Sequence, residues 1–323
     1  MKDWARVPVV LAAAGLCACG PKPHPTSVPR DSRDAHCAPV RPGQGMELIV
    51  LGSGGPRGVG RAAASYVVSV DGVPRLLIDA GPGSFVRLGE TRLATERLDT
   101  VLLTHLHVDH AGDVPAFVKS QDLRSDRALT FRFSGPEGRG AYPSTSSFLD
   151  RLFGPQGAFA YLAAFRNPLH FMTTDLPLDL DAGPTVVLQH DDLKVLSVAV
   201  DHGEVPALAF RVEHGGRSLV VSGDLASKRG RIVELARGAD LLVYDAAVLD
   251  PPGSPEGLYA LHTPPRRIGE VAAEAGVKRL LLSHIPPATE RHMSEVLESV
   301  RASFHGDVRL AHDCMQMTLN NPK

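Results

Sequence analysis

Three histidines and one aspartate fall within six consecutive positions of this chain, as His105, His107, Asp109 and His110. They follow the apolar run 101–103, which predicts a buried strand that ends in a polar loop. Side chains alternate along an extended backbone, so His105 and His107 are expected to face one way, while Asp109 and His110 start a helix and turn toward a second point. Imidazole and carboxylate groups are the usual protein ligands of zinc. The segment therefore predicts ligands for two metal ions.

Three more polar residues stand where predicted strands end: His202 after 195–200, Asp224 after 218–222, and His284 after 280–283. Each alone could be an ordinary loop residue. Together with the first motif they complete the ligands that two ions of four to five coordination need. We predict His105, His107 and His202 on one ion, Asp109, His110 and His284 on the other, and Asp224 between the two ions.

These motifs resemble those of the metallo-β-lactamase-fold hydrolases, and within them the ribonuclease Z and arylsulfatase branch. The similarity covers most of the chain beyond residue 46. It is carried by the histidine motif and by five shorter segments, namely Leu51–Pro56, Leu77–Gly83, Ser222–Asp224, His262–Thr263 and Ser283–His284. The resemblance implies an α/β, four-layer αββα sandwich with the metals at one edge between the sheets.

The order of the expected elements agrees with such a sandwich. Apolar runs with turn residues between them predict strands over 46–51, 63–70, 74–79, 99–103, 129–133, 195–200, 208–212, 218–222, 241–244 and 279–282. Helical spacing predicts helices over 109–120, 144–153, 228–237, 264–275 and 289–304.

A two-metal centre would use two divalent ions, with Zn²⁺ favoured and Mn²⁺ or Fe²⁺ as alternatives. A water between the ions would then be the nucleophile, with Asp109 orienting it or accepting its proton. The resemblance makes His262 the general acid for the leaving group. Asp79 is expected to brace a ligand histidine from behind, and Asp245 to do the same for His262.

The start of the chain has a different character. Lys2 and Arg6 precede a short apolar stretch, 9–16, which is too short to span a bilayer and is typical of a secretory signal. Its end resembles a bacterial lipobox in which Cys19 is lipidated. We predict a signal peptide over 1–18, a Pro-rich tether over 19–45 and a catalytic domain over 46–320. The alternative is an uncleaved start upstream of a cytoplasmic enzyme.

A lipoprotein signal places the domain on the periplasmic side of the cell envelope, lipid-anchored, with the outer membrane favoured. Cys37 and Cys314 would then be the remaining cysteines, and an oxidising compartment would permit them to pair. Two free thiols are the alternative. The sequence contains no CxxC pair, which argues against a cysteine zinc site.

The net charge of the chain helps to identify its substrate class, because ribonuclease Z proteins bind tRNA through a basic surface and a protruding arm. This chain has 34 Lys and Arg against 36 Asp and Glu, a net charge of −2. Its expected insertion, 154–192, contains Arg166 as its only Lys or Arg, together with Asp175, Asp179, Asp181, Asp191 and Asp192. Nucleic acid is therefore disfavoured as a partner. Apolar residues of the same segment (Phe159, Tyr161, Leu162, Phe165 and Phe171) either line a pocket for a small ester or belong to the core.

We therefore predict a binuclear hydrolase of phosphodiester or sulfate esters of small molecules. The alternatives are a ribonuclease Z-like tRNA 3′-processing endonuclease and a β-lactamase or lactonase. A non-enzyme alternative is a lipid-anchored binding protein that kept the fold but lost catalysis. Such a protein would be expected to lack one or more metal ligands, and none of the predicted ligands is missing from this chain. The sequence does not decide the oligomeric state, for which a homodimer is one candidate.

Overall fold

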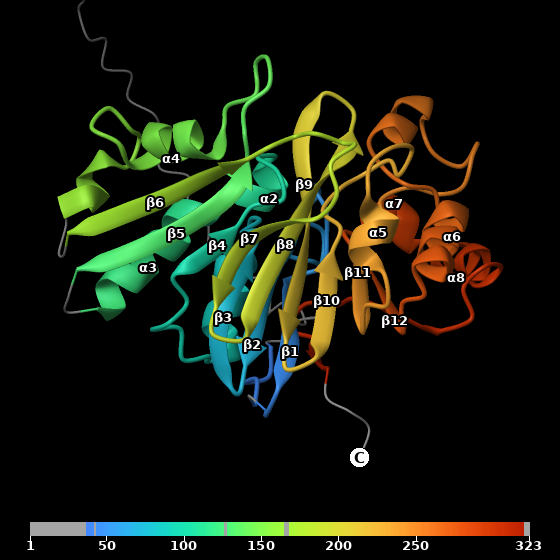
Figure 1. Cartoon of the computed structure of the whole chain (residues 1–323), viewed down its shortest axis with the longest axis horizontal. Coiled ribbons are helices and arrows are strands. Elements are labelled where there is room, and N and C mark those ends of the chain that lie inside the picture. Colours follow the sequence, from blue (N-terminus) through green and yellow to red (C-terminus); the bar gives the residue numbers. More distant parts are fainter. Residues whose placement is uncertain (1–36, 42, 126–127, 165–167, 320–323) are drawn as a thin grey trace, which may run out of the picture. The chain divides into compact units, whose positions relative to one another are not determined.

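Two seven-stranded sheets form the frame of the computed structural model, which describes residues 37–41, 43–125, 128–164 and 168–319 (Figure 1). The first sheet has the order β14 (Gln316–Thr318), β1 (Met46–Gly52), β2 (Ser65–Val70), β3 (Val73–Ile78), β4 (Thr100–Leu102), β5 (Leu129–Pro136) and β6 (Leu169–Leu176). The second has the order β13 (Asp307–Leu310), β12 (Arg279–Ser283), β11 (Leu241–Asp245), β10 (Arg217–Val221), β9 (Val205–His214), β8 (Leu193–His202) and β7 (Thr185–His190).

Each sheet combines an antiparallel part with a parallel part. In the first sheet β14, β1, β2 and β3 pair antiparallel, and β3 to β6 pair parallel. In the second sheet β7 to β10 pair antiparallel, and β10 to β13 pair parallel. Parallel strands end at the same edge of a sheet, so residues that follow them are brought together there.

Strand residues alternate between two apolar cores. Leu48 and Val50 of β1 face the second sheet, in a core that also contains Phe210 of β9, whereas Ile49 and Leu51 of β1 face outward. Both faces of β1 are thus covered, which explains why all of its residues are buried. The core between the sheets is built from strand residues and short connections, and each outer face packs against helices.

Helices cover the two outer faces (Figure 1). The core outside the first sheet includes residues of α1 (Ser84–Thr91), α3 (Val114–Arg124) and α4 (Thr145–Phe153). The core outside the second includes α5 (Ile232–Ala236), α6 (Pro265–Ala275) and α8 (Met293–Arg301). The remaining helices are short: α2 (Val108–Ala111), α7 (Pro287–Glu290), and the 3₁₀ turns η1 (Ala160–Ala164) and η2 (Glu256–Ala260). These layers confirm the predicted αββα sandwich.

All ten predicted strands occur, with ends shifted by up to three residues, but three of the five helices differ from the prediction. The helix expected over 109–120 is divided into α2 and α3, because the amide of Asp113 donates to Ala80 instead of continuing the helix and Pro115 lies in the first turn of α3. The one expected over 228–237 begins only at Ile232, after Gly230 with a φ of +93°. The one expected over 289–304 is divided into α7 and α8.

The segment 154–192, whose role the sequence left open, takes part in both sheets. It supplies the edge strand of each sheet, β6 beside β5 and β7 beside β8. Leu162 is buried, and Phe159 and Phe171 pack against the core outside the first sheet, so these three residues serve the core. Tyr161 is exposed, and Phe165 and Arg166 lie outside the described residues.

The predicted signal peptide, Cys19 and most of the tether lie outside the described residues. Residues 37–41 and 43–45 of the predicted tether run along the domain: the Val40 amide donates to Thr91, and the Gly45 amide donates to Asp71. Cys37 forms a disulfide with Cys314, with 5.6 Å between the Cα atoms, so the two cysteines are paired. Among the described residues, no helix combines the length and the apolar character needed to cross a membrane.

Candidate metal centre

The candidate site lies where strands of both sheets end. Asp79 directly follows β3 and His105 follows β4, while Asp224 follows β10 and His284 directly follows β12. His202 is the last residue of β8. Because β3 and β4 are parallel, and β10 to β12 are parallel, the topology gathers these polar residues at neighbouring sheet edges.

One group consists of His105, His107 and His202, whose ligand atoms all lie within 4.8 Å of one another. Nε2 of His105 is 3.1 Å from Nδ1 of His107, and the ring centroids of His105 and His202 are 5.0 Å apart. His105 and His202 are buried, and His107 is partly exposed. Three imidazoles that point at one place, with one side open, suit a metal with room for a further ligand.

A second group consists of Asp109, His110 and His284, again with ligand atoms within 4.8 Å of one another. Nε2 of His284 is 3.1 Å from Oδ2 of Asp109, and Nε2 of His110 is 3.8 Å from the same oxygen. All three residues are buried. Asp109 and His110 lie in the single turn of α2, whereas His284 directly follows β12 of the second sheet.

Asp224 lies between the two groups. Its Oδ2 is 3.9 Å from Nε2 of His105, in the first group, and 3.3 Å from Nε2 of His284, in the second. Its Oδ1 is 3.4 Å from Nε2 of His110. One carboxylate thus faces histidines of both groups, which is the placement expected of a bridging ligand.

The donor set fits metal ions. Nε2 of His110, Nε2 of His202 and Oδ1 of Asp224 are buried and have no hydrogen-bond partner among the described residues. Leaving a buried polar atom without a partner costs about 1–3 kcal/mol. Three such atoms in one cluster are accounted for when cations bind there, because imidazole nitrogen and carboxylate oxygen are ligands of zinc and related ions.

Burial also sets the protonation states that ligands need. It lowers the pKa of His202 to about 4, and it moves the pKa of His105 well below its ordinary value, with His110 adding to the effect. Burial works to raise the pKa of Asp224, but His284 and His110 outweigh it and hold that pKa well below its ordinary value. Neutral His105 and His202 beside an ionised Asp224 are in the forms that bind metal. At His110 burial works to lower the pKa, but Asp224 and Asp79 outweigh it and raise that pKa well above its ordinary value, so a metal ion there would displace a proton.

Asp79 and Leu261 hold two of the histidines from behind. Oδ2 of Asp79 is 2.8 Å from Nδ1 of His110, and the same carboxylate accepts hydrogen bonds from the Thr104 amide at 2.7 Å and hydroxyl at 2.8 Å. Nδ1 of His202 lies 2.7 Å from the Leu261 carbonyl oxygen. In both histidines Nδ1 is therefore engaged and Nε2 faces the cluster, as is usual for metal-binding histidines.

His262 and Asp245 form a buried pair beside the two groups. Nδ1 of His262 is 2.8 Å from Oδ2 of Asp245, which leaves Nε2 as the nitrogen available for other partners. Burial works to lower the pKa of His262, but the hydrogen bond to Asp245 outweighs it and raises that pKa. The His262 ring centroid is 5.5 Å from that of His202 and 5.7 Å from that of His284. The pair is thus placed beside both groups.

Two glycines permit close approach at the site. A Cβ on Gly55 would lie 2.9 Å from Cε1 of His284, and a Cβ on Gly81 would lie 2.1 Å from the carbonyl oxygen of Asp109. Any larger residue would displace a predicted ligand. Gly55 and Gly81 thus let the backbone pack closely against His284 and Asp109.

The structure brings all seven predicted ligands together and places His262, Asp79 and Asp245 around them; the roles of these residues as ligands and catalysts stay predictions. Sequence reasoning missed Thr104, which binds Asp79, and the Leu261 carbonyl, which binds His202. The position of Thr104 just before His105 was a usable signal. A backbone carbonyl leaves no signal in the residue types.

Known proteins resemble this chain in sequence and in fold. A family model described as "Beta-lactamase superfamily domain" matches residues 74–285. An uncharacterised protein of Mycobacterium bovis is 31% identical over 267 residues, which cover 81% of this chain and 88% of that protein. A protein named ribonuclease Z from Mycobacterium sp. (strain KMS) is 28% identical over 288 residues, or 83% of this chain and 94% of that protein. The crystal structure of the short form of human tRNase Z superposes with a TM-score of 0.66 at 22% identity, over 85% of this chain and all of that one.

Proposed function

Because this chain belongs to the β-lactamase superfamily and has the metallo-β-lactamase fold, we propose that it hydrolyses phosphodiester or sulfate esters of small molecules at a centre of two divalent metal ions. Membership assigns it to the metallo-β-lactamase-fold hydrolases. The observation that carries the proposal is the pair of three-residue groups with Asp224 between them.

We expect His105, His107 and His202 to hold one ion, and Asp109, His110 and His284 the other. Zn²⁺ is the first choice because the donors are imidazole and carboxylate, and Mn²⁺ or Fe²⁺ are alternatives. When bound, such ions supply Lewis-acid chemistry to the ester and activate water near neutral pH.

The residues around the cluster supply the proton transfers. Asp109 has an ionised carboxylate, because His284 and His110 outweigh burial and lower its pKa, so it is suited to orient a water and accept its proton. His262 is suited to be the general acid. Asp245 orients its ring and stabilises the protonated form, and Nε2 is left to donate to the leaving group.

Ribonuclease Z-like cleavage of tRNA is the second candidate, favoured by relatives that carry that name. Against it stands the net charge of −2, since gripping an RNA backbone requires many Lys and Arg. The described part of the segment 154–192 also contributes β6 and β7 to sheet edges, and its five aspartates would repel a phosphate backbone.

One experiment separates these functions. The purified protein is analysed for metals by mass spectrometry and assayed on bis-p-nitrophenyl phosphate, p-nitrophenyl sulfate, a β-lactam, a lactone and a precursor tRNA, with His107→Ala as the control. We expect about two metals per chain, and turnover of one of the first two substrates that the variant loses. Turnover of only the tRNA would select the ribonuclease reading, and turnover of only the β-lactam or lactone would select the lactamase reading. A protein without metal or turnover would leave the binding-protein alternative.

We also propose that the protein is lipid-anchored at Cys19 on the periplasmic side of the cell envelope. Support comes from the Cys37–Cys314 disulfide, because such crosslinks persist in oxidising compartments. Metabolic labelling with a palmitate analogue, followed by separation of the membranes, tests this. Label that disappears in Cys19→Ala is expected, and an unlabelled soluble protein would contradict the anchor. Sedimentation of the purified protein would decide between monomer and homodimer.

A further inference from the structure

A loop of residues 53–62, within the connection between β1 and β2, packs against His284. A Cβ on Gly55 would lie 2.9 Å from Cε1 and 3.2 Å from Nδ1 of that ring. The amide of Ile285, the residue after His284, donates to the carbonyl oxygen of Ser53 at 2.9 Å. The loop therefore contacts the imidazole and also binds the backbone that carries it.

His284 needs such support because its backbone is strained. Its φ is +53°, in the left-handed region that non-glycine residues rarely adopt because it is unfavourable for them. Such a conformation persists only where the surroundings hold it. The hydrogen bond from Ile285 to Ser53 is one such restraint, so whatever fixes Ser53 also fixes His284.

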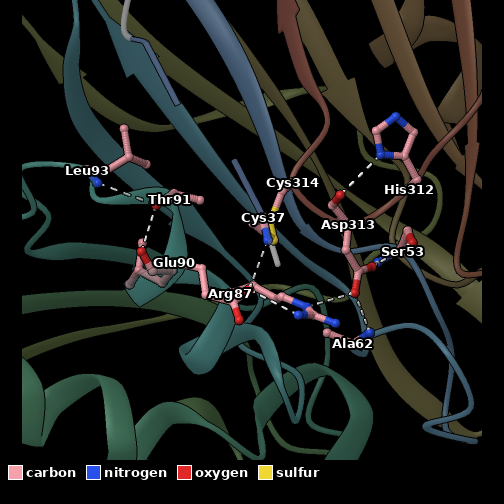
Figure 2. Close-up of a disulfide and its surroundings, with 11 residues drawn as sticks. Cys37, Ser53, Ala62, Arg87, Glu90, Thr91, Leu93, His312, Asp313 and Cys314 are labelled. Carbon is pink, nitrogen blue, oxygen red and sulfur yellow. Dashed lines mark hydrogen bonds and ion pairs between the residues drawn. A yellow bond between two sulfur atoms is a disulfide. The ribbon is translucent and has the colours of Figure 1, made fainter. Parts of the chain in front are cut away.

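A single carboxylate, that of Asp313, holds both ends of this loop (Figure 2). Its Oδ1 accepts hydrogen bonds from the Ser53 amide at 3.1 Å and the Ser53 hydroxyl at 2.8 Å. Its Oδ2 accepts one from the Ala62 amide at 2.8 Å. The Gly54 amide donates across the loop to the Ala62 carbonyl oxygen at 2.8 Å. Asp313 thus closes the loop at its base.

Asp313 is itself held from two sides (Figure 2). Its Oδ2 forms an ion pair with Nε of Arg87 at 3.2 Å, and its side chain is only 11% exposed. The next residue, Cys314, is bound to Cys37 by the disulfide, and its amide donates to the Val50 carbonyl oxygen at 2.6 Å. The position of the carboxylate is therefore fixed by a covalent link and by a charge.

We propose that Asp313 is a positioning residue for His284, and through it for the group Asp109, His110 and His284. The inference rests on the proposed function, since it assumes that this group binds a metal ion. An asparagine amide has only one acceptor oxygen. Its NH₂ group would therefore face either the Ser53 amide or the donors of Ala62 and Arg87, so asparagine cannot reproduce the contacts of Asp313. The loop would then loosen, and His284 would lose its restraint.

The test is zinc binding to metal-free protein, measured by competition with a chromophoric chelator, for the full chain and four single variants. We expect Asp313→Asn to lower the affinity for one of the two zinc ions by about 10- to 100-fold, as loss of an orienting partner does at other metal sites. Ser53→Ala removes the hydroxyl contacts with Asp313 and with Nη1 of Arg61 but keeps the amide contact with Asp313, and it should weaken binding of the same ion by about 2- to 10-fold. Asp307→Asn is the matched control, because that aspartate is exposed and pairs only locally with Arg309. His284→Ala completes the set.

Double variants localise the effect. If Asp313 acts through His284, Asp313→Asn adds little to the loss caused by His284→Ala, whereas it adds fully to the loss caused by His107→Ala in the other group. A residue with a merely structural role would add equally to both.

The outcomes are distinct. A wild-type protein that binds no zinc would overturn the proposed function and with it this inference. Two zinc ions held with unchanged affinity by Asp313→Asn would overturn the inference alone, even if that variant unfolds more easily. If Asp313→Asn cannot be purified folded, Ser53→Ala decides, and unchanged affinity for both ions in that variant would overturn the proposal.

Discussion

Oδ2 of Asp79 lies 2.8 Å from Nδ1 of His110, and this contact fixes which nitrogen of the imidazole faces the cluster. The carboxylate is itself held by the amide and hydroxyl of Thr104. Because Nδ1 is engaged, Nε2 of His110 is directed at Asp224, 3.4 Å away. Asp79 has a φ of +58°, so the chain adopts an uncommon backbone conformation at this contact.

Asp79→Asn should weaken zinc binding. The amide retains the size of the carboxylate but loses its charge and one acceptor, so the ring of His110 is no longer held with the same tautomer. We expect a loss of about 10- to 100-fold in affinity for the ion at His110. The measurement is a chelator competition on metal-free protein. Asp99→Asn, at an exposed aspartate, is the control, and equal affinities in the two variants would contradict the role of Asp79.

His262→Ala should reduce kcat without removing metal. A positioned general acid contributes roughly 10²- to 10⁴-fold to the rate, so a loss in that range is expected on a substrate with a poor leaving group. Asp245→Asn should act in the same direction and less strongly. Metal content is measured on the same samples, with His292→Ala as an exposed control. If His262→Ala binds one metal ion fewer than the wild type, His262 is a ligand instead.

Gly55→Ala should disturb the centre while Gly58→Ala does not. A Cβ on Gly55 would lie 2.9 Å from Cε1 of His284, whereas one on Gly58 would have no atom within 4 Å. Both glycines belong to the same loop, so the pair is matched. We expect weaker zinc binding and lower turnover only in Gly55→Ala. Equal behaviour of the two variants would show that the loop can yield, and that the contact does not constrain the imidazole.

Asp240→Asn should destabilise the fold far from the centre, and the loss should depend on pH. Burial works to raise the pKa of Asp240, but hydrogen bonds from Lys278, Ser218 and Arg217 outweigh it and hold the pKa below its ordinary value. The ionised form therefore stabilises the folded state at neutral pH. That contribution is complete above the unfolded pKa of about 3.9 and is lost as pH falls through the lower folded value.

Denaturant unfolding at several pH values checks this. We expect the wild type to exceed Asp240→Asn by about 1–3 kcal/mol in free energy of unfolding at pH 7, and by progressively less below about pH 4. Asp307→Asn again serves as the exposed control. A difference that is constant from pH 7 to pH 3 would show that the charge of Asp240 is not the source of its effect.

Much of this protein could be predicted from local patterns. Apolar runs with turn residues between them predict buried strands, and all ten predicted strands occur. The spacing of His105, His107, Asp109 and His110 is itself local, which is why a site with two groups could be predicted before any contact was known. The strands at the four sheet edges, β6, β7, β13 and β14, are not among the ten predicted, because an edge strand is partly solvated and lacks a continuous apolar run.

Sequence by itself thus determined the residue types, their order and the strands that precede them, because hydrophobic periodicity and ligand chemistry act over short stretches of chain. Only the tertiary structure decided that Cys37 pairs with Cys314 and that Asp313 holds the loop against His284, across sequence separations of more than 200 residues. Such contacts depend on the order of strands in the two sheets and on the packing of one sheet against the other. No local pattern encodes them, since they form only when distant segments are folded side by side.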